Sequence, residues 1–419
     1  MKYKGFALAL AFCGGGLFVF GKDTESPLTW AECVTIALRS NPDLASARAG
    51  KAASMSSYRG SYNGLLPSVS LSNSYTDSQG AGSALWTAQA SANINVIDAS
   101  ALAGIKSASA QMAQSEARQR LASAQLRLDL RRAFLRRLFD DKDIDVSRNV
   151  EEIRRKSALL VNLRYQSGRE SKGNKLRAEA QFLEATAELA QARRRIRADQ
   201  RALYRQLGLE TVEDMPVAGI LEAAEPPALP AETRGIVDQR PDVLLQEAGI
   251  RVAQADVRRA QSSVWPTLSA GYARFRSGTS EFPSDEKGWS FRGNLDYPLF
   301  GGGLTSTYYA MATSRQNLEK AKQELRSVRD QAMADLETVW SAYVTATEQA
   351  RVQAALLAAA RQRNEEADVR YNSGLLTYDN WEIIVTDRVN QERQAILAQL
   401  TAATAQAVWE HALGKSLEE

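Results

Sequence analysis

The sequence predicts a mainly α-helical protein that is built from two similar halves. Each half also contributes one β-hairpin, and the hairpins form the part that is embedded in a membrane. Three observations lead to this fold class. Short motifs recur in the same order about 200 residues apart, two very long stretches lack proline, and four short segments alternate apolar with polar residues. Helical and strand periodicities of this kind are the primary secondary-structure signals in a sequence.

The recurring motifs indicate an ancestral duplication. "NPDL" at 41–44 returns as "RPDV" at 240–243, and "RYQSG" at 164–168 returns as "RYNSG" at 370–374. The offsets, 240 − 41 = 199 and 370 − 164 = 206, differ by only a few residues. A unit of this length is too long for a solenoid repeat. We therefore expect the following parts: a leader over 1–21, a first repeat over 22–221, a Pro-rich connector over 222–232 and a second repeat over 233–419.

The leader has the pattern of a secretory signal peptide. Two lysines precede an apolar run over 5–20, and small residues precede Lys22, where cleavage is expected. A retained membrane anchor is the alternative, although the run is short for a spanning helix. Cys13 raises the possibility of lipidation, which the bulky residue before it disfavours. After cleavage only Cys33 remains, so no intramolecular disulfide can form.

Each repeat begins with a helix or helix pair, which ends at a proline that cannot continue the helix but can open a strand. Two strands then follow, with apolar and polar residues alternating over about ten positions, as a transmembrane barrel strand requires. The expected strands cover about 67–76, 84–97, 266–276 and 288–299. The alternative is the edge of a soluble sandwich, but the sequence offers no partner sheet.

Aromatic residues near the strand ends favour the membrane interpretation. Trp86 and Trp289 lie near one end of the hairpins, and Trp265 and Tyr297 lie near the other. Tryptophan and tyrosine are enriched at both membrane–water interfaces, where they form girdles around a barrel.

The rest of each repeat is a long helical hairpin, expected over about 99–208 and 303–413. At roughly 1.5 Å per residue, the long helix of each hairpin is a rod of about 100 Å. Leucine and other apolar residues recur at spacings of three and four, so each rod needs partner helices in a bundle or coiled coil.

Each copy of "RYxSG" marks the tip of one hairpin. Gly168 and Gly374 stand where a helix C-terminus favours a left-handed residue. Arg164 and Arg370 lie in the last turn, where a cation suits the helix dipole. Asp379 is well placed as the N-cap of the helix that follows the second tip.

Several of these segments resemble the duplicated signatures of TolC-type outer-membrane efflux proteins. They are "RYNSGLLTYDNW", "RPDVLLQEAGIRVAQADVRRAQSSVWPTLSAGY" and "LDYPLFGGG". The resemblance implies a homotrimer whose protomers each give four strands to a shared 12-stranded β-barrel in the lipid of the outer membrane. It further implies a trimeric α-helical tunnel across the periplasm, a periplasmic adaptor at its tips and an inner-membrane pump of RND or ABC type. The chain would be the passive channel of a tripartite efflux or type I secretion system.

The resemblance also assigns residues. The family's adaptor-contacting tip maps onto Ser373, Gly374 and Leu375, and more loosely onto Gln166, Ser167 and Gly168. The candidates for a periplasmic gate are Arg370, Tyr371, Asp379, Asn380 and Glu382. The positions that carry aspartate rings in the family are Asn380 and Ile383 here, so whether the gate is charged stays open. Carboxylates that faced one another across a three-fold axis would be able to bind a cation.

Composition argues against other function classes. The 52 basic and 49 acidic residues nearly cancel, which gives no reason to expect nucleic-acid binding. "GRESKGNK" at 168–175 departs from a phosphate loop at the lysine and hydroxyl positions. His411 is the only histidine, so we expect neither an enzyme nor a metal or cofactor site. The competing interpretation is an exported helical-hairpin adaptor or scaffold that never enters a membrane, which leaves the four strands without a role.

Overall fold

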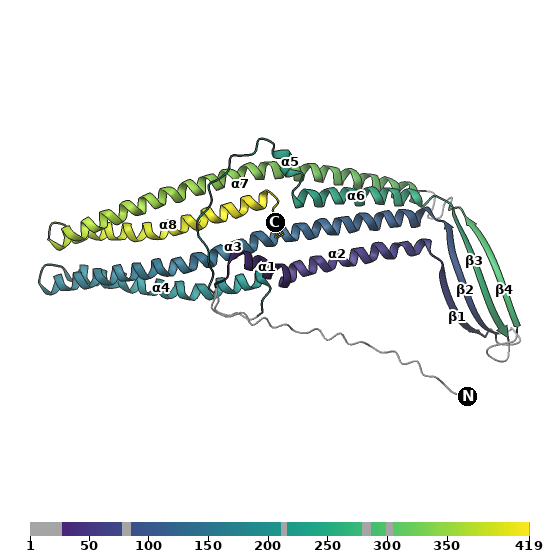
Figure 1. Cartoon of the computed structure of the whole chain (residues 1–419), viewed down its shortest axis with the longest axis horizontal. Helices are drawn as coiled ribbons and strands as arrows, with labels where there is room; N and C mark the ends of the chain where they lie inside the picture. Colours follow the sequence, from purple (N-terminus) through teal and green to yellow (C-terminus); the bar gives the residue numbers. More distant parts are fainter. Residues whose placement is uncertain (1–26, 78–84, 211–215, 279–285, 299–304, 419) are drawn as a thin grey trace, which may run out of the picture.

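The computed structural model describes residues 27–77, 85–210, 216–278, 286–298 and 305–418. The expected leader and the glycine-rich end of "LDYPLFGGG" lie outside the described residues. The described part is an elongated molecule with a four-stranded sheet at one end and two helical tips at the other (Figure 1).

The two halves contain the same sequence of elements. Each has a pair of helices, a β-hairpin and a long helical hairpin. In the first half these are α1 (Trp30–Ser40), α2 (Pro42–Gly60), the 3₁₀ turn η1 (Ser61–Leu65), β1 (Ser68–Thr76), β2 (Leu85–Ile97), α3 (Ala99–Gln166) and α4 (Lys172–Leu207). In the second half they are α5 (Thr233–Val237), α6 (Pro241–Ser262), β3 (Thr267–Gly278), β4 (Glu286–Asp296), α7 (Ser306–Asn372) and α8 (Tyr378–Ala412).

Local capping sets several helix ends. Thr29 and Glu32 form a capping box at the start of α1, and the Asn41 side chain accepts a hydrogen bond from the N–H of Leu44 at the start of α2. The expectation that Asp379 caps α8 is wrong. The helix begins at Tyr378, so Thr377 occupies the N-cap position and Asp379 falls in the first turn, where its charge still suits the dipole.

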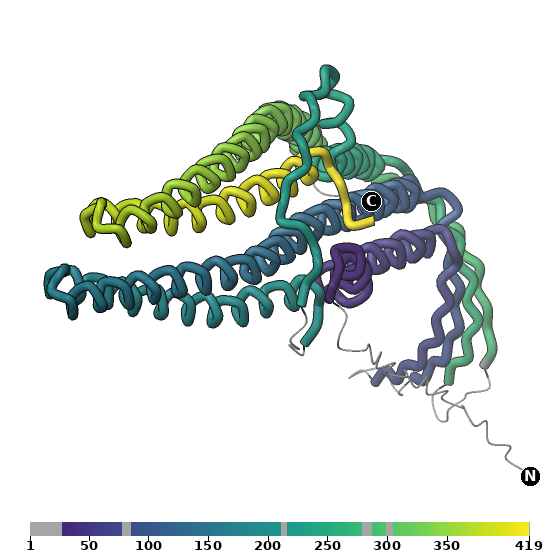
Figure 2. Tube along the Cα trace, turned by 60° about the vertical axis from the view of Figure 1, so that its left-hand side comes forward, coloured from purple at the N-terminus to yellow at the C-terminus, as the bar shows by residue number. Residues whose placement is uncertain are grey.

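The long helices pair as the apolar stripes predicted. α3 packs along α4 and α7 packs along α8, while the shorter α2 and α6 lie beside the halves of α3 and α7 nearest the sheet (Figures 1 and 2). The stripes themselves are buried, with Leu130 and Phe134 in α3 and Leu336 and Tyr343 in α7 almost inaccessible to solvent.

The largest core lies at mid-length, where segments from both ends of the chain meet. The segment after residue 216 crosses the helices there (Figure 1), and it is held by hydrogen bonds from Tyr343 Oη to the Ala224 carbonyl and from Trp340 Nε1 to the Pro227 carbonyl, 2.7 and 2.9 Å long. Leu417, near the C-terminus, is buried in the same core as α1 and α3 residues.

The sheet has the order β1-β2-β3-β4, and every neighbouring pair is antiparallel. Residues directly opposite one another point to the same face, and the register places Leu71 opposite Ala90 and Tyr272 opposite Phe291. On this apolar face Leu71 is 84% exposed and Phe291 is 68% exposed. Among the described residues, no helix is both long and apolar enough to cross a membrane.

Candidate functional site

The two "RYxSG" segments end α3 and α7 in the same way. Gly168 and Gly374 have φ of 72° and 77°, which favours glycine because a Cβ crowds the backbone there. The N–H of Arg169 bonds to the Arg164 carbonyl, and the N–H of Leu375 bonds to the Arg370 carbonyl, both at 2.9 Å. These are the bonds of a Schellman motif. The tips are therefore rigid turns whose shape is set by their own sequence.

The residues expected to contact an adaptor lie on the open ends of these turns. Gln166, Ser167, Gly168, Ser373 and Gly374 are all exposed. Leu375 is 80% exposed, although leucine is usually buried. The Ser167 and Ser373 hydroxyls donate to carbonyls of their own helices.

A set of three residues joins the two tips within one chain. The Arg164 guanidinium donates to the carbonyl oxygen of Tyr371 at 2.8 Å, and its Cζ lies 4.4 Å from the centre of the Tyr371 ring. The Tyr371 hydroxyl in turn donates to the Glu170 carboxylate at 3.1 Å. We call Arg164, Glu170 and Tyr371 the tip link. It fastens the first hairpin to the second through one cation–π contact and two charge-assisted hydrogen bonds.

Aromatic packing keeps the tyrosine of the tip link in place. Tyr371 is fully buried, and its ring stacks on Trp381 at a centroid distance of 4.4 Å and an interplanar angle of 10°. Trp381 is held from its other edge, because its Nε1 donates to Asp368 at 2.7 Å. Burial raises the pKa of Tyr371, and the bond to Glu170 raises it further, so the hydroxyl stays protonated.

A buried carboxylate lies behind the link. Glu382 is only 6% exposed, and it accepts hydrogen bonds from Gln181 at 2.6 Å and from Thr386 at 2.8 Å. Arg177 lies 3.2 Å away, and Arg154 binds both Gln181 and Thr386. Burial alone would raise the pKa of Glu382, but these bonds and charges outweigh it and lower the pKa overall. This network joins α3, α4 and α8 inside the protomer.

Farther from the tips, one charge-assisted hydrogen bond and one ion pair join the two hairpins. Glu392 on α8 is 2% exposed and accepts a 2.6 Å bond from Asn149 on α3. Arg361 on α7 lies 3.4 Å from the same carboxylate. Arg393 on α8 pairs with Glu188 on α4.

A second buried carboxylate lies within the first hairpin. Asp140 on α3 is 1% exposed and accepts a 3.3 Å bond from Arg195 on α4. Burial raises the pKa of Asp140 to about 7, and the neighbouring Asp199 contributes to that rise. We therefore expect the stability of the α3–α4 packing to depend on pH near neutrality.

The gate candidates occupy three different environments. Tyr371 and Glu382 are buried in contacts between the hairpins, whereas Asp379 and Asn380 are exposed at the start of α8. Asp379 lies 4.0 Å from Arg177. The Arg370 side chain is exposed and has no bonding partner in the described part of the chain.

Sequence reasoning missed three residues of this site. Glu170 and Arg154 gave no local signal, because the partners that join them to the second hairpin, Tyr371 and Thr386, are more than 200 positions away. Arg164 was interpreted only as a helix-ending cation. Comparison of the two copies holds one clue, since the position of Glu170 corresponds to Leu376 at the offset of 206.

The aromatic residues expected at the membrane interface lie at or near the ends of the strands. Trp86 contacts Tyr75 across β1 and β2 at 4.7 Å, and Trp289 stacks with Tyr272 at 6.5 Å. At the helical end of the sheet Trp265 and Tyr297 are 61% and 56% exposed.

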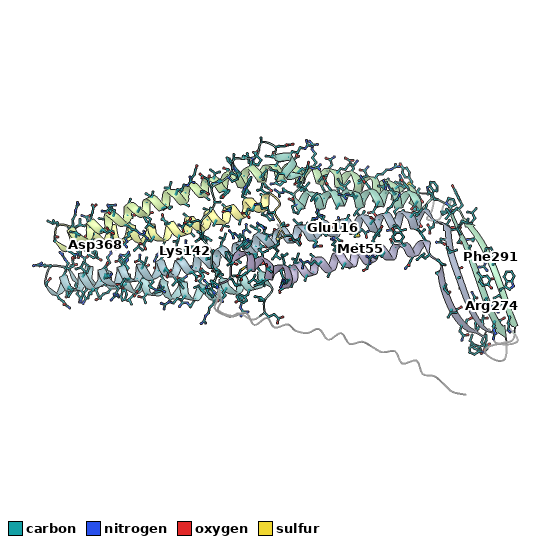
Figure 3. All side chains as sticks on the ribbon, in the orientation of Figure 1. Met55, Glu116, Lys142, Arg274, Phe291 and Asp368 are labelled. Atoms are coloured by element: carbon teal, nitrogen blue, oxygen red, sulfur yellow. The ribbon has the colours of Figure 1, made fainter. Side chains whose placement is uncertain are left out.

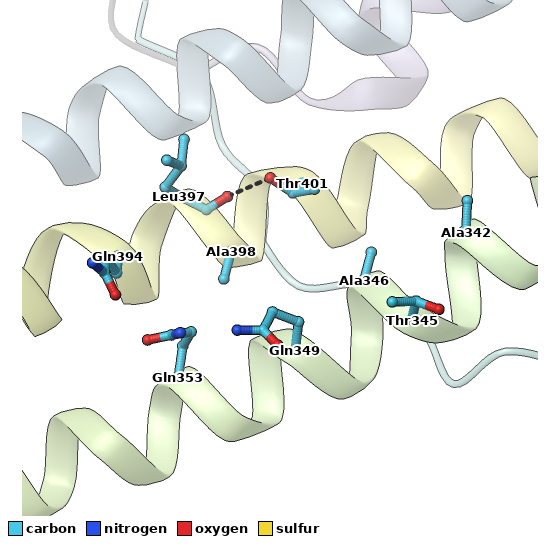
Figure 4. A pocket seen from close by; sticks show the side chains of 9 residues that line it. All are labelled: Ala342, Thr345, Ala346, Gln349, Gln353, Gln394, Leu397, Ala398 and Thr401. Atoms are coloured by element: carbon cyan, nitrogen blue, oxygen red, sulfur yellow. Dashed lines mark hydrogen bonds between the residues drawn. The ribbon is translucent and has the colours of Figure 1, made fainter.

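A shallow groove of about 600 Å³ runs between α7 and α8. Figure 4 shows Gln349 and Gln353 on α7 facing Gln394 and Ala398 on α8 across it. Its lining is uncharged, so it offers no ion-binding set. Nor do the described residues contain any group of three or more His, Cys, Asp and Glu side chains placed to hold a metal.

The chain was compared with known families, curated proteins and solved structures. The family model described as "Outer membrane efflux protein" matches residues 34–209 and 236–415. No curated protein matches the chain. The fold is similar to that of the outer membrane protein VceC from Vibrio cholerae, at 18% identity and a TM-score of 0.78 over 92% of this chain and 96% of that one. It is also similar to the open state of the MtrE outer membrane channel from Neisseria gonorrhoeae, at 19% identity and a TM-score of 0.81 over 92% and 89%. The Campylobacter jejuni CmeC outer membrane channel matches at 15% identity and a TM-score of 0.79, over 100% of this chain and 95% of that chain.

Proposed function

The chain belongs to the outer membrane efflux protein family, and from this premise we propose that three copies close around one axis and dock by their tips onto a periplasmic adaptor. As a member of the family it is an outer-membrane channel for efflux, with a long periplasmic tunnel. The inner-membrane pump behind the adaptor would be of RND or ABC type. The family membership is shown, whereas the trimer, the adaptor and the pump are what we propose.

The main observation in favour of a trimer is that the sheet has two unpaired edges among the described residues. β1 pairs only with β2 and β4 pairs only with β3, so in the described residues each outer strand has one edge without a partner. Within a bilayer an open edge would leave backbone groups unpaired, which is why membrane sheets close into barrels. Three copies give 3 × 4 = 12 strands, joined by β1 of one copy and β4 of the next.

The duplication also suggests how neighbouring protomers contact one another at the tips. In a closed ring of hairpins, each first hairpin lies between a second hairpin of its own chain and one of the next chain. Arg164 serves the contact within the chain, where it binds the carbonyl of Tyr371. At the offset of 206 the equivalent pair is Arg370 and Tyr165. We propose that the exposed Arg370 binds the carbonyl of Tyr165 in the next protomer.

The adaptor contact rests on the exposed tips. Leu375 at the second tip and the turn residues Gln166 to Gly168 at the first are solvent-accessible and make few contacts with the rest of the chain. An exposed leucine in a capped turn offers apolar surface whose burial against a partner would favour binding.

The test is the mass and location of the native channel. Mild-detergent extracts of outer membranes, analysed by native mass spectrometry, should give three chain masses, and a salt wash should release none of the protein. A monomer or dimer in detergent contradicts the trimer, and release by salt contradicts membrane insertion and favours the scaffold interpretation. Replacing Arg370 with alanine should weaken trimer cohesion at the tips, whereas Arg164→Ala should leave contacts between protomers intact.

A further inference from the structure

Three cations stand on the apolar face of the sheet, where lipid contact is expected. The register places Arg274 opposite Trp289 and opposite Ala90, and it places Arg276 opposite Lys287 and opposite Ala88. Opposed residues share a face, so all three cations lie on the side that carries Leu71, Tyr272 and Phe291. The neighbouring polar residues on the other side include Ser70, Gln89 and Arg292.

These cations lie in the part of the sheet far from the helices. Figure 3 shows Arg274 closer than Phe291 to the loop end of the hairpins. Trp289 lies opposite Arg274, and Trp86 lies two register pairs beyond Arg276 toward the loops. Tryptophans mark the membrane interface, so the cations are at the outer boundary of the bilayer rather than at its centre.

No acidic side chain that the structure describes neutralises this charge. Arg274, Arg276 and Lys287 are exposed, and they form no ion pair with any described residue. In the described strands the face they occupy carries no aspartate or glutamate. A cation that faces lipid costs free energy unless it reaches the interface or an anion.

The surface between the cations is open. Small side chains at Ala88 and Ala90 leave a hollow of about 430 Å³, lined also by Leu71 and by all three cations. The cations thus lie beside a hollow whose lining combines apolar residues with the polar Ser72, Asn73 and Gln89. A ligand that fits has phosphate groups next to acyl chains.

We propose that Arg274, Arg276 and Lys287 bind the phosphate groups of a phosphorylated glycolipid of the outer leaflet, the lipid A part of lipopolysaccharide. Arginine matches phosphate by paired hydrogen bonds, and lysine adds a point charge. This lipid carries its phosphates at the depth of the cations and its acyl chains at the depth of Leu71 and Phe291. The inference rests on the proposed closed barrel, because closure is what turns the apolar face toward lipid.

The experiment uses the full-length channel in detergent and measures binding of lipid A by native mass spectrometry. The probes are bisphosphorylated lipid A, the same lipid without phosphates, phosphatidylglycerol and inorganic phosphate. The test variant is Arg274→Gln/Arg276→Gln/Lys287→Gln. Its matched control is Arg292→Gln, which removes a cation from the opposite face of the same sheet.

We expect the native channel to retain bisphosphorylated lipid A, the triple variant to lose at least about tenfold in affinity, and the control to bind normally. Equal binding by the triple variant overturns the proposal, as does an equal loss in Arg292→Gln. Equal binding of the dephosphorylated lipid excludes phosphate recognition, and equal binding of phosphatidylglycerol excludes a glycolipid site. If inorganic phosphate displaced lipid A at equal concentration, the lipid part would contribute nothing to the affinity. That result would also overturn the proposal.

The same spectra separate this inference from the trimer. Samples that are trimeric but bind no lipid A contradict only the lipid site, whereas monomeric samples contradict the proposed barrel itself.

Discussion

Replacing Tyr371 with phenylalanine tests the tip link most directly. The change removes one hydroxyl but keeps the ring that stacks on Trp381 and lies beneath Arg164. A hydrogen bond to a charged group contributes about 1.5–3 kcal/mol. The lower end applies here, because Glu170 keeps its bonds from the Ser171 N–H and from Asn174. About 1.5 kcal/mol per protomer shifts the ratio of linked to unlinked tips about tenfold.

The assay is single-channel conductance in planar bilayers. We expect Tyr371→Phe to raise the mean conductance, or the fraction of time in high-conductance states, because separated tips widen the tunnel mouth. The duplication offers the control, Tyr165→Phe, since the Tyr165 hydroxyl has no hydrogen-bond partner among the described residues and its ring contacts Lys175. Unchanged conductance in Tyr371→Phe would refute the reasoning, and so would an equal increase in Tyr165→Phe.

Three other expectations follow from the site and the core. Asp140→Asn should stabilise the protein at pH 8 but not at pH 4, and melting curves at both pH values check this. The folded pKa of Asp140, about 7, exceeds its unfolded value, so the stability of the native protein falls as pH rises from the unfolded to the folded pKa. Above the folded pKa the charged carboxylate costs at most about 4 kcal/mol. Gly208→Ala should prevent normal folding, since φ at this residue is +75° and the new Cβ would lie 2.1 Å from the Ser40 carbonyl oxygen. The assay is the yield of folded protein in the outer membrane. A normal yield would contradict the close packing of Gly208 against Ser40. Leu375→Asp should abolish adaptor capture and lower efflux without changing the oligomer mass, and unaltered capture would exclude the second tip as the contact.

The long elements of this fold were predictable because their signals are local. Helix α3 ends at Gln166, as expected from the glycine two residues later, and α7 ends at Asn372 for the same reason. The strands lie within about two to three residues of the expected bounds, because alternation marks all four and a proline directly precedes β1 and β3. The start of α8 was misplaced, since the threonine and the aspartate near it are both acceptable caps and local sequence does not decide between them.

The contacts between the halves were not predictable in the same way. Arg164 and Arg370 stand in identical motifs, yet one is bonded to the neighbouring hairpin and the other is exposed. The difference arises from tertiary placement, which no window of local sequence reports. Glu382 shows the same limit, because its burial and its donors Arg177 and Gln181 on α4 come from residues about 200 positions away.

In the proposed trimer, the duplication would give the tunnel mouth two kinds of contact between neighbouring hairpins. Within a chain this contact has an arginine, a carbonyl, a buried tyrosine and the Glu170 carboxylate. Between chains the equivalent position of that carboxylate is Leu376, so an Arg370–Tyr165 contact would lack the second hydrogen bond. A contact with fewer charge-assisted bonds separates at a lower free-energy cost. We therefore expect the mouth to open first between protomers, and each protomer to move as a unit of two linked hairpins.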